Sequence, residues 1–308
     1  MSTPDALHRP GPAAGVDRSA TTGGMDGPGT PDGRDAALTM VRRILFYVLV
    51  AFGTAFFALP MLWLLSAPFD DTPTYAVGLP DVLTLDNFAE IFRNRYAVSS
   101  LVNSTILAVG TMAVVVTFAA LAAYALSRAR VPGRDALLYL LLLLSSVVTG
   151  TAAMVPIFLL IFQLRLIDSH FGVVLVLSGG LLPAAIFLLK DFIDTIPRSY
   201  EESARVFGAS PLQILRHIVV PVARPGLATI AVWTLVQVWG SFLTPFILLR
   251  NPDKQPAAVL VRTFYTEGGS PNLGLLAAFS LLYSVPVVLM YLLAWSRYGF
   301  RFHGGIKS

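Results

Sequence analysis

The stretch Ser199–Pro221 reads SYEESARVFGASPLQILRHIVVP and forms a polar island between two long apolar segments. Its first part has the end signals of a short helix. Ser199 can cap the N terminus, and Glu202, three residues later, can complete a capping box. Gly208 can end the helix in the left-handed conformation that glycine adopts without strain. The pattern therefore predicts a short helix from Ser199 to just before Gly208.

The second part of the stretch predicts another short helix. Ser210 can cap it, Pro211 suits its first position, and Gln213 completes a second capping box. Apolar residues recur at helical spacing in both helices, at Tyr200, Ala204 and Phe207 and then at Leu212, Leu215 and Val219. We therefore expect each helix to have one apolar face, and the pair to form a compact helix-turn-helix at a membrane surface.

The composition indicates an integral membrane protein. Hydrophobic residues make up 55% of the 308 residues and charged residues 13%, and the mean hydropathy is +0.70. A soluble domain of this length would have a more charged surface. The net charge of +4 does not indicate nucleic-acid binding, because the basic residues lie in short loops between apolar spans. The absence of cysteine excludes disulfides and thiolate metal sites.

The apolar segments predict six membrane spans and an all-α fold. Residues 1–40 are rich in Gly, Pro, Ala and Asp, which predicts a disordered tail, and residues 41–308 form the membrane domain. The spans cover about 42–67, 100–126, 135–162, 171–192, 222–249 and 273–295. Each exceeds the roughly 20 residues that cross a bilayer. The polar segment 68–98 predicts an external loop with a short amphipathic helix near 87–92.

Basic residues predict the orientation of these spans. An even number of spans places both termini on one side, and the loops of that side hold Arg42, Arg43, Arg128, Arg130, Arg134, Lys190, Arg198, Arg205, Arg216, Arg224, Arg297, Arg301 and Lys307. The opposite side holds fewer, namely Arg93, Arg95, Arg165, Arg250, Lys254 and Arg262. By the positive-inside rule, both termini and the 198–221 loop are cytoplasmic.

The 198–221 loop resembles the Glu-Ala-Ala loop of ATP-binding-cassette (ABC) importer permeases, above all the carbohydrate-uptake branch related to the maltose permeases. The positions that carry the likeness are Glu202, Ser203, Ala204, Gly208, Ile218 and Pro221. Three residues depart from the pattern: Ser203 stands for an Ala, Phe207 for an Asp and Val220 for a Leu. The small residues and the glycine remain, so the loop can still be packed closely.

Weaker likenesses extend from about Asn103 to Lys307. They lie at Asn103–Thr105, Ala123–Arg128, Val131–Arg134, Val155–Pro156, Leu166–Ser169, Leu182–Pro183, Ile196–Pro197, Trp239–Phe242 and Gly304–Ser308. Gly240 stands where the branch usually has Asn, so a hydrogen bond from that amide is lost. The terminal segment does not match a phosphate-binding loop, because Ile306 precedes the lysine and a helix would have to follow.

The resemblance implies a MetI-like type I importer permease in the bacterial inner (plasma) membrane. It implies four kinds of partner: a dimer of cytoplasmic ATP-binding subunits, a second homologous permease subunit, an extracellular or periplasmic solute-binding protein, and a sugar. Membrane lipid surrounds the spans. The chain itself is expected to be no enzyme and to hold no cofactor or metal, because ATP binds to the partner subunits.

The same resemblance selects candidate site residues. Contact with the ATPase is expected from Glu202, Ser203, Ala204, Gly208, Ala209, Ser210 and Pro221, and a second contact from the tail residues Gly304, Gly305 and Lys307. A purely structural alternative exists for two of them, since Glu202 can be a capping residue and Gly208 a helix stop. For both residues the structural and functional roles are compatible.

Four residues are candidates for the solute path, namely Asn103, Gln237, Trp239 and Phe242. Polar side chains at membrane depth usually face the interior of the bundle, and aromatic rings can stack on sugars. Hydrogen bonds between helices and plain aromatic packing are the competing explanations.

Three other functions each require features that can be sought in the sequence. A carrier driven by an ion gradient needs buried carboxylates, and the predicted spans contain almost none. A membrane-embedded enzyme needs converging catalytic or metal-binding side chains, and the spans show no such cluster. An ABC importer for a solute other than a sugar is the alternative that the resemblance leaves open.

Overall fold

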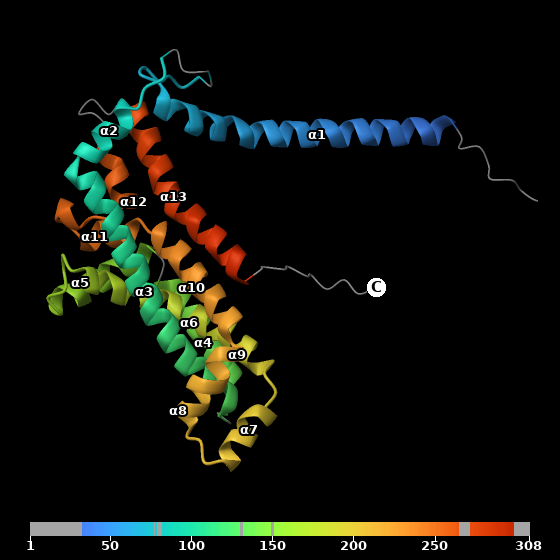
Figure 1. Cartoon of the computed structure of the whole chain (residues 1–308), viewed down its shortest axis with the longest axis vertical. Helices are drawn as coiled ribbons and strands as arrows, with labels where there is room; N and C mark the ends of the chain where they lie inside the picture. The colour runs from blue at the N-terminus through green and yellow to red at the C-terminus, as the bar shows by residue number, and fades with distance from the viewer. Residues whose placement is uncertain are drawn as a thin grey trace, which may run out of the picture. The chain divides into compact units, whose positions relative to one another are not determined.

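The structure, a computed structural model, describes residues 33–76, 78, 82–129, 132–148, 151–264 and 272–298. Within these ranges the regular structure is helical (Figure 1). In chain order the helices are α1 (Gly33–Ser66), η1 (Ala67–Phe69), α2 (Asp86–Arg93), α3 (Arg95–Arg128), α4 (Arg134–Val148), η2 (Thr151–Ala153), α5 (Met154–Gln163), α6 (His170–Asp194), α7 (Ser199–Val206), α8 (Pro211–Ile214), η3 (Leu215–Val219), α9 (Val220–Val222), α10 (Arg224–Trp239), α11 (Leu243–Leu248), η4 (Pro252–Lys254), α12 (Ala257–Leu260), η5 (Val261–Phe264) and α13 (Leu273–Tyr298).

The chain divides into two compact units, Met1–Phe57 and Ala58–Ser308. The described part of the first unit is the N-terminal portion of α1, which carries large exposed apolar side chains from Met40 to Phe57. The second unit contains all the other helices. It holds the functional site and is described below.

Among the described residues, four helical segments are long and apolar enough to cross a membrane. They are Thr39–Phe69, α3, α6 and Leu273–Leu293 of α13. A fifth span results when Pro211–Val222 and α10, which meet at an angle of 79°, are counted together. Helices α6 and α13 cover the predicted spans 171–192 and 273–295, and α2 covers the predicted amphipathic helix near 87–92.

Two predicted boundaries were wrong. Residues 33–40, expected to belong to a disordered tail, are helical, because α1 begins at Gly33. Residues 1–32 lie outside the described part of the chain. Helix α3 begins at Arg95 rather than near residue 100, because Asn94 caps it: its side chain accepts bonds from the N–H groups of Tyr96 and Ala97 at 3.0 and 3.3 Å.

Two predicted spans are not continuous helices. The third, 135–162, is divided into α4 and α5, with η2 between them. The sequence at this break combines β-branched residues with Gly150, which are weak helix formers. The fifth, 222–249, stops being helical at Trp239, and α11 follows after Gly240 and Ser241. Hydropathy alone placed both spans, and it does not register a break within an apolar run.

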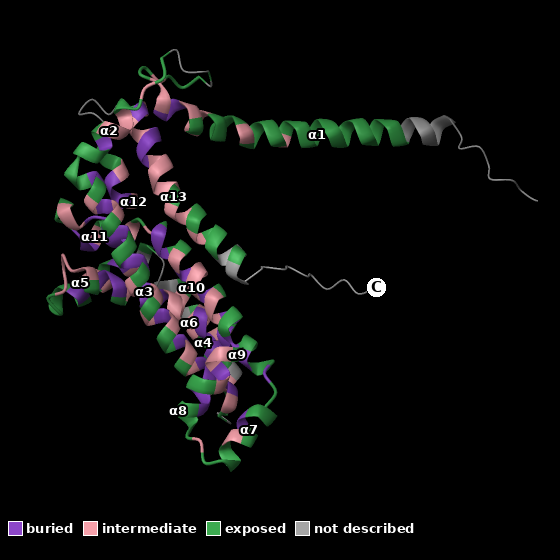
Figure 2. Ribbon diagram, viewed as in Figure 1, coloured by how far each residue is buried: buried purple, intermediate pink, exposed green. Residues whose placement is uncertain are grey.

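The core of the second unit is formed mainly by α3, α6 and α10. Many of the fully buried residues along α3 are small, with Ala119 and Ala123 both 0% exposed, and Ala185 of α6 is 0% exposed as well. Ile230 of α10 packs into the same cluster. Small residues let helix backbones approach closely, which is how helices associate in membranes without a hydrophobic driving force. Buried positions accordingly concentrate where these three helices meet (Figure 2).

The contact between α10 and α6 depends on Gly226. A Cβ atom at this position would lie 2.7 Å from Cγ of Phe192. Gly226 itself is buried in α10, one turn after the bend that follows α9. The glycine therefore sets how closely the start of α10 approaches the end of α6.

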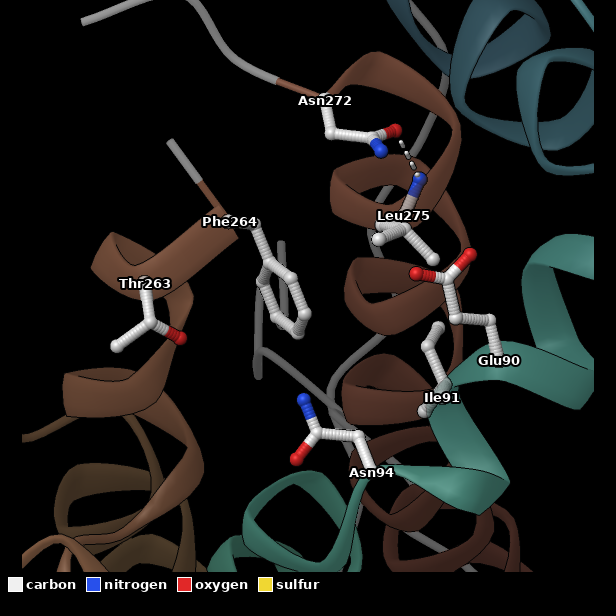
Figure 3. Close-up of a pocket in the computed structure, with 7 residues that line it drawn as sticks. All are labelled: Glu90, Ile91, Asn94, Thr263, Phe264, Asn272 and Leu275. Carbon is white, nitrogen blue, oxygen red and sulfur yellow. Dashed lines mark hydrogen bonds between the residues drawn. The ribbon is translucent and has the colours of Figure 1, made fainter. Parts of the chain in front are cut away.

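The opposite end of the second unit is held by Asn87 of α2. Its amide donates to the carbonyls of Pro68 and Asp70, at 3.1 and 3.0 Å, and it lies against Gly274 of α13. Beside it is a cavity of about 240 Å³ lined by α2, η5 and the start of α13 (Figure 3). Asn272 caps α13 there, with its side-chain oxygen 3.1 Å from the N–H of Leu275. Polar side chains thus order the ends of these helices.

Replacing Gly226 by Ala tests the packing of α10 on α6. An alanine normally stabilises a helix interior, but here overpacking against Phe192 should destabilise the fold by about 1–3 kcal/mol. The measurement is the thermal transition of the purified chain in detergent. Gly240→Ala is the matched control, because a Cβ there meets only the carbonyl of Val236 at 3.8 Å. Equal stability of the two variants would contradict the close contact.

Candidate functional site

The candidate site is the pair of short helices α7 and α8 at one end of the bundle (Figure 1). It follows the end of α6 and lies beside the end of α3. The far end of α3 lies about 50 Å away, because each of its 34 residues adds about 1.5 Å. Any movement applied to α7 and α8 must therefore travel along the spans to reach the cavity end.

Gly208 ends α7 as predicted. Its φ is +82°, in the left-handed region, and its N–H donates to the carbonyl of Arg205 at 2.9 Å. The N–H of Ala209 reaches back to the carbonyl of Ala204 at 3.1 Å. No atom outside its chain neighbours lies within 4 Å of a Cβ built on Gly208. Within this chain, glycine is therefore required by backbone conformation and not by space.

The second capping box is confirmed. The side chain of Ser210 accepts from the N–H of Gln213 at 3.4 Å, and the side chain of Gln213 accepts from the N–H of Ser210 at 2.8 Å. Pro211 occupies the first helical position. The turn between α7 and α8 is thus specified on both sides by local sequence.

The prediction of a capping box formed by Ser199 and Glu202 was wrong. Ser199 is the first residue of α7 rather than its cap, and the cap position, Arg198, makes no side-chain bond to the helix. The carbonyl of Ser199 instead accepts from the hydroxyl of Ser203 at 2.9 Å. Glu202 is exposed, so its carboxylate is left accessible at the surface of the loop.

The predicted apolar face of α7 was wrong for a related reason. Tyr200 is 57% exposed and Phe207 90% exposed, whereas Glu201, a charged residue, is 2% exposed. Glu201 is held by Arg128 of α3, whose Nε lies 2.6 Å from its Oε1. The helix is therefore rotated to bury a carboxylate, and its aromatic residues face outward. For the second helix the prediction holds at Leu215 and Val219, which are buried, but not at Leu212.

Sequence reasoning missed Glu201, and one signal could have found it. Arg128 ends α3 in a run that the sequence places at the cytoplasmic boundary, and Tyr124 lies four residues before it on the same helical face. The hydroxyl of Tyr124 donates to Oε2 of Glu201 at 3.2 Å. Two polar groups on one face at the end of an apolar helix indicate a buried polar partner.

The outer surface of the loop is apolar and hollowed. Val206 is 84% exposed and Leu212 66% exposed, beside the exposed ring of Phe207. A hollow of about 340 Å³ is lined by Phe207, Gly208, Ala209, Gln213, Ile214, His217 and Ile218. Exposed residues predominate on α7 and on the turn to α8 (Figure 2). A cluster of exposed large apolar side chains beside a hollow is typical of a protein interaction site.

The loop is joined to α10 through an unusual helix. After α8 the chain continues as the π-helix η3, with Pro221 in α9 and then the 79° bend into α10. Such π-helical segments and prolines mark bends in helices. Pro221, a predicted site residue, therefore lies at the joint between the loop and the fifth span.

Of the four predicted solute-path residues, two bond to other segments of the fold and two are exposed. Asn103 is buried, and its amide donates to the carbonyls of Asp253 and Gln255 at 2.8 and 3.2 Å. Trp239 stacks on Tyr283, with ring centroids 5.7 Å apart, and its Nε1 donates to the Tyr283 carbonyl at 3.1 Å. Both therefore join helices or loops.

Gln237 and Phe242 are exposed near the end of α10. The ring of Phe242 stacks on Phe246, with centroids 5.2 Å apart, and Arg262 lies 4.9 Å above Phe246. These groups are open to a solute or to another chain. The tail residues Gly304, Gly305 and Lys307 lie outside the described residues.

The described residues contain no group of three or more His, Asp or Glu side chains placed to hold a metal ion. The buried polar groups of Tyr124, Arg128 and Glu201 bond to one another instead. What the arrangement offers is an anchored loop with an apolar outer surface, which can bind a partner and move with the spans.

Comparison with known proteins identifies the family of this chain. Residues 116–296 match the family of binding-protein-dependent transport system inner membrane components. The trehalose transport system permease protein SugB of Mycobacterium tuberculosis is 30% identical over 261 residues, which cover 83% of this chain and 94% of SugB. The maltodextrin transport system permease protein MdxG of Bacillus subtilis is 28% identical over 254 residues, covering 82% and 91%.

A solved structure has the same fold. A chain of a bacterial ABC transporter involved in the import of the acidic polysaccharide alginate superposes with a TM-score of 0.70. It covers 87% of this chain and 98% of its own length, at 22% identity. The all-helical permease fold is therefore confirmed.

Replacing Ser210 by Ala tests the capping box. Loss of the cap should weaken the start of α8 by about 1 kcal/mol, which corresponds to roughly fivefold faster amide exchange in this turn. Hydrogen exchange of peptides that cover residues 208–216 measures it. Thr229→Ala, which removes a hydroxyl bonded to the Pro225 carbonyl, is the control and should leave these peptides unchanged. Unaltered exchange in the Ser210 variant would show that the box does not hold the turn.

Proposed function

The chain belongs to the family of binding-protein-dependent transport system inner membrane components, and on this premise we propose that it is the permease subunit of an ATP-driven carbohydrate importer. The similarity of 82–83% of its length to permeases named for maltodextrin and trehalose carries the proposal. A third relative, NgcG of Streptomyces coelicolor, is named for diacetylchitobiose uptake. The substrate we propose is therefore an oligosaccharide or a related polyol.

The apolar surface of α7 and α8 is the proposed contact with a cytoplasmic ATPase subunit. Phe207 and Val206 project from it, and the hollow beside them can receive side chains of the partner. Glu202, Ser203 and Ser210 are exposed around it and supply polar contacts. An apolar centre with a polar rim is the usual anatomy of a protein interface.

Alternating access follows from this contact. Closure of two ATPase subunits on ATP would move the docked loop, and the joint at Pro221 would carry that movement into α10. The spans would then switch between inward-open and outward-open arrangements, as packed helices do when they have two stable arrangements. The chain performs no chemistry of its own, and ATP binds to the partner subunits.

The remaining partners are a second homologous permease subunit and a solute-binding protein. Large apolar side chains along α1, such as Phe46, Phe56 and Leu62, are exposed and fit lipid or a second permease. Gln237 and Phe242 at the end of α10 are the groups of this chain proposed to face the solute. We place both termini in the cytoplasm, where the tail residues Gly304, Gly305 and Lys307 would make a second ATPase contact.

Family membership favours this function over a carrier driven by an ion gradient. An importer for a solute that is not a sugar is the other candidate within the family. The named substrates of the three relatives favour the carbohydrate.

The substrate class is tested with the solute-binding protein that co-purifies with this chain. We expect it to bind maltodextrin, trehalose or another oligosaccharide, and cells that lack this chain should lose uptake of the same labelled sugar. A panel of amino acids, peptides and phosphate serves as the control. Binding of a control solute, with no sugar bound, would contradict the carbohydrate assignment.

Docking is tested with two separate substitutions in the loop, one at Gly208 and one at Phe207. Gly208→Asn suits the positive φ but adds a side chain on the hollowed surface, whereas Phe207→Ala removes an exposed apolar ring. Both should leave the thermal stability of the chain within about 0.5 kcal/mol and lower the amount of ATPase that co-purifies. Arg224→Gln, on an exposed side chain outside the loop, is the control. Full retention of the ATPase by both loop variants would contradict docking at this surface.

A further inference from the structure

The ion pair between Arg128 and Glu201 is the most buried one among the described residues. The side chain of Arg128 is 9% exposed and that of Glu201 is 2% exposed, whereas every other described ion pair has at least one partner more than a third exposed. The pair joins α3 to α7 across 73 residues of sequence. It is therefore a tertiary link between a span and the loop.

Arg128 also forms hydrogen bonds to the segment that leads from α6 into α7. One Nη donates to the carbonyls of Ile193 and Ile196, at 3.3 and 3.1 Å, and the other to the hydroxyl of Ser127 at 3.0 Å. The guanidinium is a rigid planar fork, so these bonds fix its direction as well as its position. A single side chain of α3 thus holds the end of α6 and the start of α7 together.

A second polar layer lies behind the first. The hydroxyl of Ser127 donates to Asp194, and Nζ of Lys190 lies 2.8 Å from the same carboxylate. Both carboxylates at this junction therefore have cationic partners: Glu201 pairs with Arg128 at 2.6 Å and with the exposed Arg205 at 3.9 Å, and Asp194 pairs with Lys190. Hydrogen bonds within such a network reinforce one another in a setting of low dielectric constant.

The two faces of α7 thus have different roles. Its inner face carries Glu201 and is bound to α3, while its outer face carries Glu202 and leads to the exposed ring of Phe207. A partner that pushes on the outer face cannot turn α7 independently without separating a buried ion pair. Separation would leave the buried Arg128 without a carboxylate, and Glu201 with only the exposed Arg205 at 3.9 Å, which is unfavourable.

From this geometry we propose that Arg128 and Glu201 are positioning residues that make α7 move with α3 and the end of α6. Glu201 acts inside the permease and not on the ATPase, unlike Glu202. The inference rests on the proposed function, because it states how movement of the docked loop reaches the spans. It adds a second path, through α3, to the path through Pro221 and α10.

The first test measures the distance between α7 and α3. The natural chain has no cysteine, so Tyr200→Cys and Ala125→Cys, both at exposed positions, can carry two spin labels without background. In the complete complex the label distance should be narrow and the same with and without ATP and Mg²⁺. With Glu201→Gln added, the distribution should broaden or shift on ATP binding. An unchanged narrow distribution would overturn the proposal.

The second test measures coupling. The readout is the factor by which the loaded solute-binding protein stimulates ATP hydrolysis by the complex in vesicles. Glu201→Gln and Arg128→Lys should each lower this factor by about 3- to 30-fold, while ATPase subunits remain bound. Asp191→Asn, which alters an exposed carboxylate 3.8 Å from Lys190, is the matched control and should leave the factor unchanged. Wild-type stimulation in both pair variants would overturn the proposal.

A double variant separates positioning from simple stabilisation. Arg128→Met combined with Glu201→Gln removes both charges, so no buried charge is left unpaired and thermal stability should recover. The proposal predicts that stimulation stays low, because the directional bonds to α7 and α6 are still missing. Recovery of stimulation together with stability would show that the pair only stabilises the fold.

Different results would contradict the proposed function and the proposed role of the ion pair. If the wild-type chain purifies without an ATPase subunit, the proposed function is wrong and this inference falls with it. If the ATPase remains bound and Glu201→Gln couples normally, docking stands and only the role of the pair is wrong.

Discussion

The structure depends on one electrostatic constraint: the carboxylate of Glu201 is buried and must keep Arg128, its buried cationic partner, since its other partner, Arg205, is exposed and 3.9 Å away. Removing one member of such a pair typically costs about 3–5 kcal/mol, because the other charge remains in the interior. Arg128 meets the requirement with a 2.6 Å bond and with further bonds to the backbone after α6. The rotation of α7 follows from it. Once Glu201 faces inward, Tyr200 and Phe207 must face outward, which produces the apolar surface assigned to the ATPase.

The loop combines local and tertiary control. Gly208 and the Ser210–Gln213 box define the turn between α7 and α8 by themselves. The orientation of that turn relative to the spans is set by contacts from α3 and by the close approach of Gly226 to Phe192. A loop with a rigid turn and a fixed orientation can pass on a displacement, whereas a flexible one would absorb it.

At the other end of the bundle, polar side chains also form hydrogen bonds between separate segments of the fold. Asn87 and Asn103 use their amides on backbone carbonyls, and Trp239 and Tyr283 bond to each other's backbone. Among the described residues, these polar groups therefore connect one segment of the fold to another.

Composition and hydropathy in the sequence were sufficient to predict the membrane class and most spans. Local signals were sufficient to predict the turn at Gly208 and the cap at Ser210, because each depends on residues within one turn of helix. The resemblance of the 198–221 loop was sufficient for the family. The breaks in the third and fifth spans, the missing cap at Ser199 and the burial of Glu201 instead of Tyr200 were not predicted. The break in the third span has a local cause, a run of weak helix formers that hydropathy does not register. The burial of Glu201 depends instead on which side chains meet across the fold, and only the tertiary structure brings Arg128 to Glu201 over 73 residues. A buried charge outweighs an apolar periodicity, because an unpaired carboxylate in the interior costs more than an exposed aromatic ring.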